Sequence, residues 1–204
     1  MMSFWDQQFS AAEFKYGTSP NAFLREQATR LAPNSTVLVP GDGEGRNGVW
    51  LAEQGHRVTS VDNSTVGLAK AQALASERGV SIETVCADLG LWRPTARSSY
   101  ALVLVYVHFP PLVRTSIHRQ LLAGLRAGGV LILEAFHPRQ LGRASGGPKD
   151  VTMLYTLDML RADVAGVPDA VFDECVAWEG ETHLDEGPGH RGDAHVTRFV
   201  AQRV

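Results

Sequence analysis

Short apolar runs alternate with longer amphipathic segments along most of the chain, and this alternation constrains the fold more than any other feature. Residues 35–40, 56–62, 80–88, 100–107 and 127–136 are predicted to be strands. Segments 46–54, 65–78 and 111–126 have the spacing of helices. Because the strands are rich in β-branched residues and alternate with helices, the pattern predicts a mostly parallel sheet with helices on both faces.

The pattern changes after Phe136. Segment 137–150 is rich in glycine and proline and too polar for a core, so we expect either a lid loop over a binding cleft or a passive surface loop. A short helix is expected at 156–163. Runs 169–180 and 194–204 alternate apolar and polar residues, and a polar connection, 181–193, joins them. They predict an antiparallel strand pair that closes the sheet.

Composition narrows the class of protein. The 204 residues fit one domain, 1–204, and the net charge of −3 comes from 19 basic and 22 acidic residues that are intermixed. This balance argues against a nucleic-acid partner and favours a small-molecule substrate. Two cysteines without paired spacing predict a reducing compartment and no metal site. With no leader-like or membrane-length apolar run, we expect a cytoplasmic protein without a membrane partner, a monomer or homodimer.

Glycines alternate in the turn between the first predicted strand and the first helix: Gly41, Gly43 and Gly45. Such a turn lets a ligand lie against the backbone near a helix N-terminus. Asp62 ends the second strand, where a carboxylate can accept hydrogen bonds from both ribose hydroxyls. Asp88 ends the third strand and can accept from an adenine amine. Together they indicate a site for one nucleoside; the alternative is a tight turn beside solvated acids.

A dinucleotide site is the weaker alternative. Gly43, Gly45 and Gly48 also match the G-x-G-x-x-G pattern of nicotinamide-dependent oxidoreductases. That fold needs a second mononucleotide-binding half after the fifth strand, and the predicted antiparallel finish is foreign to it.

The motifs resemble those of class I S-adenosylmethionine-dependent methyltransferases over essentially the whole chain: "VLVPGDGEGRN", "VTSVDNS", "CADLGLW" and "LRAGGVLILEAF". "YGTSPNAFL", "HFPP", "GGPKD" and "EGPGHRG" resemble the tellurite-resistance and thiopurine methyltransferase branch. The resemblance implies a Rossmann-like three-layer sandwich whose seven-stranded sheet has the order 3-2-1-4-5-7-6, with the last strand antiparallel. It also implies S-adenosylmethionine as cofactor and S-adenosylhomocysteine as product.

The resemblance implies roles for particular residues. The glycines face the methionine end of the cofactor, Asp62 the ribose, and Asp88 with Leu89 the adenine. The N-terminal segment 1–30 covers the cofactor, with Trp5 and Tyr16 near it; core packing is the other interpretation of these aromatic residues. The full set of implied cofactor contacts is Trp5, Tyr16, Gly41, Asp42, Gly43, Glu44, Gly45, Asn47, Asp62, Asn63, Ser64, Ala87, Asp88, Leu89 and Tyr106.

One position departs from the family pattern. Many members have an acid at the last core position of the first strand, and this chain has Val39 there. Either Asp42 supplies the missing charge near the ammonium group of the cofactor, or backbone carbonyls meet that group.

The acceptor is predicted only as a chemical class. Methyl transfer from a sulfonium is an in-line displacement, and an ionised acceptor needs no base. "VHFPP" replaces the Asn/Asp-Pro-Pro-aromatic motif of enzymes that methylate amides or adenine, which favours a soft or anionic acceptor. His108 is the candidate base, or else it only shapes the pocket. Phe109, His137 and Arg139 are candidate acceptor contacts, although solvation explains Arg139 equally well.

The sequence therefore predicts an S-adenosylmethionine-dependent methyltransferase of the tellurite or thiopurine type. A protein that keeps the fold and binds the cofactor without catalysis is the main alternative, and a nicotinamide-dependent oxidoreductase is a weaker one.

Overall fold

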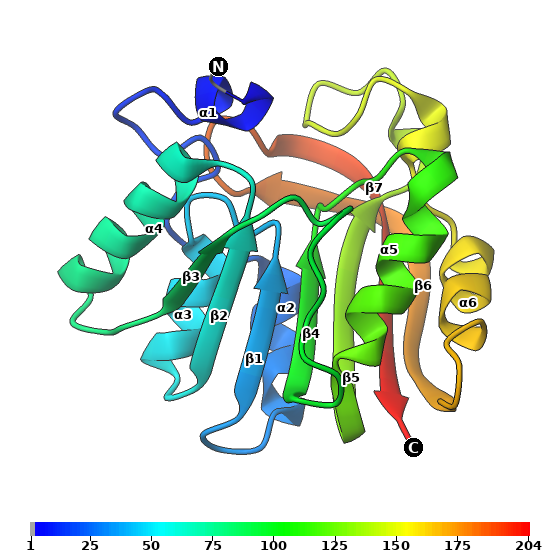
Figure 1. Ribbon diagram of the computed structural model, residues 1–204. Coiled ribbons are helices and arrows are strands. Elements are labelled where there is room, and N and C mark those ends of the chain that lie inside the picture. The colour runs from blue at the N-terminus through cyan, green and yellow to red at the C-terminus, as the bar shows by residue number, and fades with distance from the viewer. Residues whose placement is uncertain (1–2) are drawn as a thin grey trace.

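The computed structural model describes residues 3–204 and is built around one seven-stranded sheet with the order β3-β2-β1-β4-β5-β7-β6 (Figure 1). Neighbouring strands are parallel except β7, which runs antiparallel to both β5 and β6. The strands are β1 (Thr36–Pro40), β2 (Arg57–Asp62), β3 (Glu83–Cys86), β4 (Ser99–Val105), β5 (Leu125–Phe136), β6 (Phe172–Asp185) and β7 (Arg191–Arg203). The predicted fold class, strand order and antiparallel last strand are confirmed.

Helices cover both faces of this sheet (Figure 1). Leu24, Leu51 and Leu74 from three helices share one buried cluster with β1 and β4, and Leu121 and Leu160 belong to a second cluster on the other face. The helices are α1 (Phe4–Gln8), α2 (Ala22–Gln27), α3 (Arg46–Glu53), α4 (Thr65–Glu77), α5 (Pro111–Ala123) and α6 (Leu157–Ala165), with 3-10 turns at Ala28–Arg30, Pro138–Gln140 and Val151–Met153. Within the described chain, no helix has the length and apolarity needed to cross a bilayer.

The largest differences from the predicted boundaries are in three segments. The third strand pairs only over 83–86, and the helix predicted to reach residue 126 stops at Ala123, after which β5 begins at Leu125. The connection predicted at 181–193 is wrong for most of its length, because β6 and β7 extend through it and leave a turn of five residues, 186–190. Polar residues such as His183 and Asp193 lie opposite each other in this antiparallel ladder, whose backbone pairing needs no apolar alternation.

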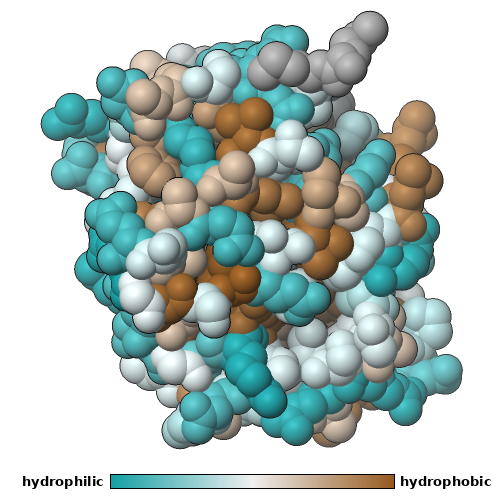
Figure 2. All heavy atoms as spheres, turned by 60° about the vertical axis from the view of Figure 1, so that its left-hand side comes forward, coloured by the Kyte–Doolittle hydropathy of each residue, from teal (hydrophilic) through white to brown (hydrophobic). Residues whose placement is uncertain are grey.

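The described chain has no helix between β3 and β4, so part of one sheet face is not covered by a helix. A groove of about 600 Å³ opens beside the first residues of these strands, lined by side chains such as Thr36, His56 and Glu83. It lies at the opposite end of β1 from the glycine turn. Figure 2 shows the molecule turned so that the left-hand side of Figure 1 comes forward, with apolar side chains gathered near the middle and hydrophilic ones around them.

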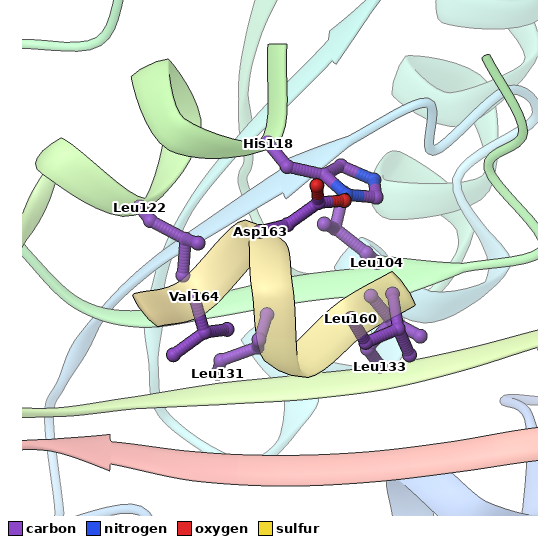
Figure 3. Close-up of a pocket in the computed structure, with 8 residues that line it drawn as sticks. All are labelled: Leu104, His118, Leu122, Leu131, Leu133, Leu160, Asp163 and Val164. Atoms are coloured by element: carbon purple, nitrogen blue, oxygen red, sulfur yellow. The ribbon is translucent and has the colours of Figure 1, made fainter. Parts of the chain in front are cut away.

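A buried polar cluster joins α5 to α6. Asp163 of α6 accepts hydrogen bonds from Arg114 Nε (2.9 Å) and Thr115 Oγ1 (2.8 Å), and it lies 2.8 Å from His118 Nδ1. Below it lies a cavity of about 10 Å³, lined by His118, Asp163 and leucine and valine side chains (Figure 3). Burial raises the pKa of Asp163, but hydrogen bonds from His118, Arg114 and Thr115 outweigh that effect and lower it to about 2.

We predict that Asp163→Asn lowers the free energy of unfolding by about 2–4 kcal/mol at pH 7, because the substitution replaces a buried carboxylate that accepts three hydrogen bonds by a neutral amide. The pKa of Asp163 lies below its usual 3.8, so the carboxylate stabilises the fold above pH 4 and this contribution is lost as the pH falls towards 2. Urea unfolding at pH 7 and pH 3 measures both effects. Equal stability of the two proteins at pH 7 contradicts the role of this cluster, and the exposed Asp158→Asn is the control.

Candidate functional site

The carboxyl ends of β1 and β4 meet where the strand order reverses, which is where open α/β sheets bind ligands. Gly41 follows β1 with φ +68°, and its N–H donates to Val61 O at 2.6 Å. A Cβ on Gly41 would lie 2.7 Å from Val107 Cγ2, just beyond β4. The first glycine is therefore required by the close approach of the two loops.

Asp62 joins the glycine turn to the start of α4. Its Oδ2 accepts from Gly43 N and its Oδ1 from Ser64 N, both at 2.9 Å. The carboxyl group is buried, and burial raises its pKa although backbone hydrogen bonds oppose this. Each carboxylate oxygen has a second acceptor position, so Asp62 still has the capacity to accept from a ligand's hydroxyls.

The end of β3 lies beside Asp62. Ala87 N donates to Asp62 O at 2.9 Å, and the next residue, Asp88, is exposed and accepts from Gly90 N at 2.8 Å. Leu89 packs partly buried against the core, and Asn63 is exposed. The structure thus brings the three predicted strand ends together, with an exposed acid and a partly buried apolar side chain at the third.

Of the two predictions for the ammonium group of the cofactor, the position of Asp42 favours the one that relies on backbone carbonyls. The Asp42 carboxylate lies under the glycine turn, where Oδ2 accepts from Ser60 Oγ at 2.6 Å and Oδ1 from Gly48 N at 3.2 Å. A Cβ on Gly48 would lie 2.3 Å from Asp42 Oδ2, so this buried acid and Gly48 depend on each other. Since both oxygens face β2 and α3, Asp42 supports the turn from inside and does not replace the acid missing at Val39, which is itself buried in the core.

This burial predicts a pH dependence. It raises the pKa of Asp42 from its usual 3.8 to about 6. The folded protein then holds a proton that the unfolded chain releases, so this contribution to stability is present below pH 3.8 and is lost as the pH rises to about 6.

In the wild-type protein, Asp42 is expected to lower the free energy of unfolding by about 2–3 kcal/mol as the pH rises from 4 to 6, since each pKa unit corresponds to about 1.4 kcal/mol. We predict that Asp42→Asn removes this decrease. Urea titrations across this range measure the slope. An unchanged slope in the variant contradicts the prediction. The exposed Asp150→Asn is the control.

The N-terminal segment docks on the glycine turn. Asp6 of α1 accepts from Ser64 Oγ at 2.8 Å and from Val66 N at 3.2 Å, which adds an acid to the N-terminus of α4. The Phe9 ring packs against Gly43, where a Cβ would lie 2.9 Å away, and Trp5 stacks on Phe9 at 5.4 Å between ring centroids. This part of the predicted covering segment therefore lies over the turn; residues 1 and 2 of that segment lie outside the described residues.

Further bonds hold this segment in place. Glu44 Oε2 accepts from Lys15 N at 2.8 Å, and its Oε1 pairs with Lys70. Asn47 Oδ1 accepts from Asn21 N at 2.9 Å. Glu44 and Asn47, both predicted cofactor contacts, are thus engaged with residues of the chain itself.

A buried charged cluster adjoins the turn. Glu134 of β5 accepts from Arg198 Nε of β7 at 2.7 Å and also from the Tyr106 hydroxyl. Tyr106 has φ +56°, which is unusual for a bulky residue and places strain just beyond the carboxyl end of β4. The pKa of Tyr106 is raised well above its usual value by burial and by Glu134.

Arg46, the first residue of α3, belongs to the same region. Its Nη2 donates to Glu186 at 2.8 Å, while its Nη1 is buried and has no partner among the described residues. Arg46, Glu134 and Glu186 were not among the site residues predicted from the sequence. Glu134 alone had a signal, as the one acid inside the apolar run "VLILEAF".

His108 lies at the acceptor side of the sheet end. Its Nδ1 is 2.7 Å from Met153 O and its Nε2 accepts from Phe136 N at 3.2 Å. A carbonyl can only accept and an N–H can only donate, so these partners fix a neutral imidazole with the proton on Nδ1. Burial lowers its pKa to about 4. Of the two predicted roles, this geometry favours shaping the pocket over acting as a base.

The other residues predicted to contact the methyl acceptor lie in two different places. Phe109 is buried near His108, where its N–H lies 2.6 Å from the Tyr155 hydroxyl. His137 packs instead against His195 of β7, with ring centroids 4.6 Å apart, and Arg139 is exposed. The predicted lid, 137–150, passes beside the turn between β6 and β7, because a Cβ on Gly146 would lie 2.6 Å from His190 Cδ2.

Comparisons with known proteins agree with this arrangement. A family model described as a methyltransferase domain matches residues 37–129, which contain the glycine turn, Asp62 and Asp88. A comparison with curated proteins finds no match.

Solved structures show the same fold. One of them is a structure on the conversion of a disulfide bond into a thioacetal group during echinomycin biosynthesis. Its protein is 18% identical to this chain, with a TM-score of 0.74 over 96% of this chain and 86% of that one. TehB from Haemophilus influenzae is 18% identical, with a TM-score of 0.67 over 98% and 65%. Magnesium protoporphyrin IX methyltransferase from Synechocystis PCC 6803, solved with bound S-adenosylhomocysteine, is 18% identical, with a TM-score of 0.66 over 90% and 79%.

The chain therefore has the class I methyltransferase fold and a matching methyltransferase domain, and S-adenosylmethionine is the cofactor of that class.

Proposed function

We propose that this protein binds S-adenosylmethionine at the ends of β1, β2 and β3 and transfers its methyl group to a small acceptor. The observation that carries the proposal is Asp62, a buried carboxylate with free acceptor positions between the glycine turn and α4. Asp62 is the last residue of β2, a position where related nucleotide-binding α/β folds carry a ribose-binding acid, and the matched methyltransferase domain includes it.

The residues around Asp62 fit the parts of this cofactor. Asp88 and Leu89 offer an acid and an apolar surface for the adenine, as an exposed and a partly buried side chain at the end of β3. Arg46 Nη1 is a buried donor without a partner in residues 3–204, and a carboxylate is the group that best satisfies a guanidinium. The cofactor supplies a methyl group on a sulfonium, which needs no activation by the protein.

The protein's part in the reaction is to position the acceptor and exclude water. In-line displacement depends on close alignment of nucleophile and methyl carbon. His108 lacks a free ring nitrogen, so we infer an acceptor that is already ionised or soft, such as a thiolate or an oxyanion like tellurite. Similarity to TehB and to a protein of sulfur chemistry supports this choice of acceptor.

Asp62→Ala is predicted to weaken binding of S-adenosylhomocysteine by about 1–3 kcal/mol, because two charge-assisted hydrogen bonds lose their acceptor. Isothermal titration calorimetry measures the effect, and Asp185→Ala, an exposed acid on the hairpin, is the control. An unchanged binding constant in Asp62→Ala rules out the ribose assignment.

Transfer of a labelled methyl group to a panel of tellurite, selenite and aromatic thiols tests the reaction. Because the buried imidazole is already neutral, the rate with an ionised acceptor is predicted to lack an inflection near pH 6.5. A rate that rises through that inflection, and loses it in His108→Gln, shows that His108 acts as a base.

A cofactor-binding protein without catalysis is the second candidate. Two observations favour it: Val39 in place of the usual acid, and the engagement of both His108 nitrogens. It predicts tight binding of the cofactor with no transfer to any acceptor in the panel. A nicotinamide-dependent oxidoreductase is disfavoured by the antiparallel β7, and it predicts thermal stabilisation by NAD instead.

A further inference from the structure

The turn between β6 and β7 folds back onto the N-terminal segment. Gly189 N donates to Lys15 O at 2.8 Å. Gly187 and Gly17, both with positive φ, touch so closely that a Cβ on Gly187 would lie 2.3 Å from Gly17 N. Two parts of the chain that are distant in sequence thus form one cover beside the glycine turn.

Glu186 holds this cover together. It is 9% exposed and accepts hydrogen bonds from Arg46 Nη2 at 2.8 Å, Asn21 Nδ2 at 2.9 Å and Ala22 N at 3.3 Å. The first belongs to α3 and the other two to the N-terminal segment. His190 Nδ1 of the same turn lies 3.8 Å from Glu186 Oε2. One carboxylate on the hairpin therefore fixes both the guanidinium and the segment above it.

The Nη1 group of Arg46 is a donor that is left free for a ligand. The residue is 6% exposed, and Nη1 has no acceptor among residues 3–204. A buried charged donor without an acceptor is costly, so an acceptor is expected from outside the chain. Because the guanidinium is a planar fork, fixing Nη2 on Glu186 also fixes the direction of Nη1.

We propose that Glu186 is a positioning residue for the cofactor: it holds Arg46 so that Nη1 receives the carboxylate of the methionine moiety. The inference rests on the proposed function, and it assigns the β6–β7 hairpin a part in cofactor recognition. Glu186 touches no ligand atom in this account and acts through Arg46.

Two ligands separate this role from a structural one. S-Adenosylhomocysteine carries the amino-acid carboxylate, whereas 5′-methylthioadenosine keeps the nucleoside and lacks it. Calorimetry with the full-length chain is expected to show that Arg46→Gln and Glu186→Gln each weaken S-adenosylhomocysteine binding about tenfold, the value of one charge-assisted hydrogen bond. Binding of 5′-methylthioadenosine stays within about twofold of wild type in both variants, because the bonds to the nucleoside are intact.

The double variant tests whether Glu186 acts through Arg46. Glu186→Gln is expected to cause no further loss of S-adenosylhomocysteine affinity once Arg46 is Gln, since coupled residues are not additive. Additive losses overturn the proposal, as do equal losses for both ligands or unchanged S-adenosylhomocysteine affinity in Glu186→Gln. Asp185→Asn, the exposed neighbour, is the control and leaves both affinities unchanged.

A variant that fails to fold does not block the test. If Glu186→Gln does not fold, Arg46→Lys is measured in its place, because the lysine ammonium keeps the pair with Glu186 but has no second nitrogen for the ligand. Equal affinity of Arg46→Lys and wild type for S-adenosylhomocysteine then overturns the proposal. Failure of the wild-type chain to bind either ligand refutes the proposed function itself. If the wild-type chain binds 5′-methylthioadenosine and Glu186→Gln weakens both ligands equally, only this inference is refuted.

Discussion

The bonds from Gly43 N and Ser64 N to the Asp62 carboxylate organise the end of the sheet. They tie the turn after β1 to the start of α4, while the backbone oxygen of Asp62 receives Ala87 N from the end of β3. Three consecutive strand ends thus meet at one residue. Because the carboxylate is buried and keeps acceptor positions free, the same group builds this end of the sheet and can accept hydrogen bonds from the proposed nucleoside.

The sequence predicted this centre for physical reasons that act locally. β-Branched apolar runs specify buried parallel strands, and Gly41 and Asp62 stand directly after two of them. Parallel strands bring their carboxyl ends to one edge, so placing residues at strand ends is enough to place them near one another. The strand order and the antiparallel β7 came from the family resemblance together with the alternating pattern at the end of the chain, and both are confirmed.

What the sequence did not predict depends on side-chain direction and on contacts between distant segments. Asp42 sits in the glycine turn, but whether its carboxylate turns outwards or towards Ser60 depends on the space left by Gly48. The cluster of Asn21, Arg46, Glu134 and Glu186 joins four separate parts of the chain, and no spacing rule connects them. Its members are recognisable only once the fold has brought them together.

A cover made from distant segments follows from that cluster. The N-terminal segment lies over the glycine turn, the β6–β7 hairpin holds it through Glu186, and the predicted lid packs beside His190. Buried Glu134 and Glu186 are matched by Arg198 and Arg46, so the cluster carries no net charge of its own. A zwitterionic amino-acid group can enter such a region without leaving a buried charge uncompensated.

A crystal structure with bound S-adenosylhomocysteine tests the central claim most directly. The account predicts one molecule at the ends of β1 to β3, with both ribose hydroxyls on Asp62 and the adenine beside Leu89. Density for the molecule elsewhere, or an empty site after soaking at millimolar concentration, would contradict it.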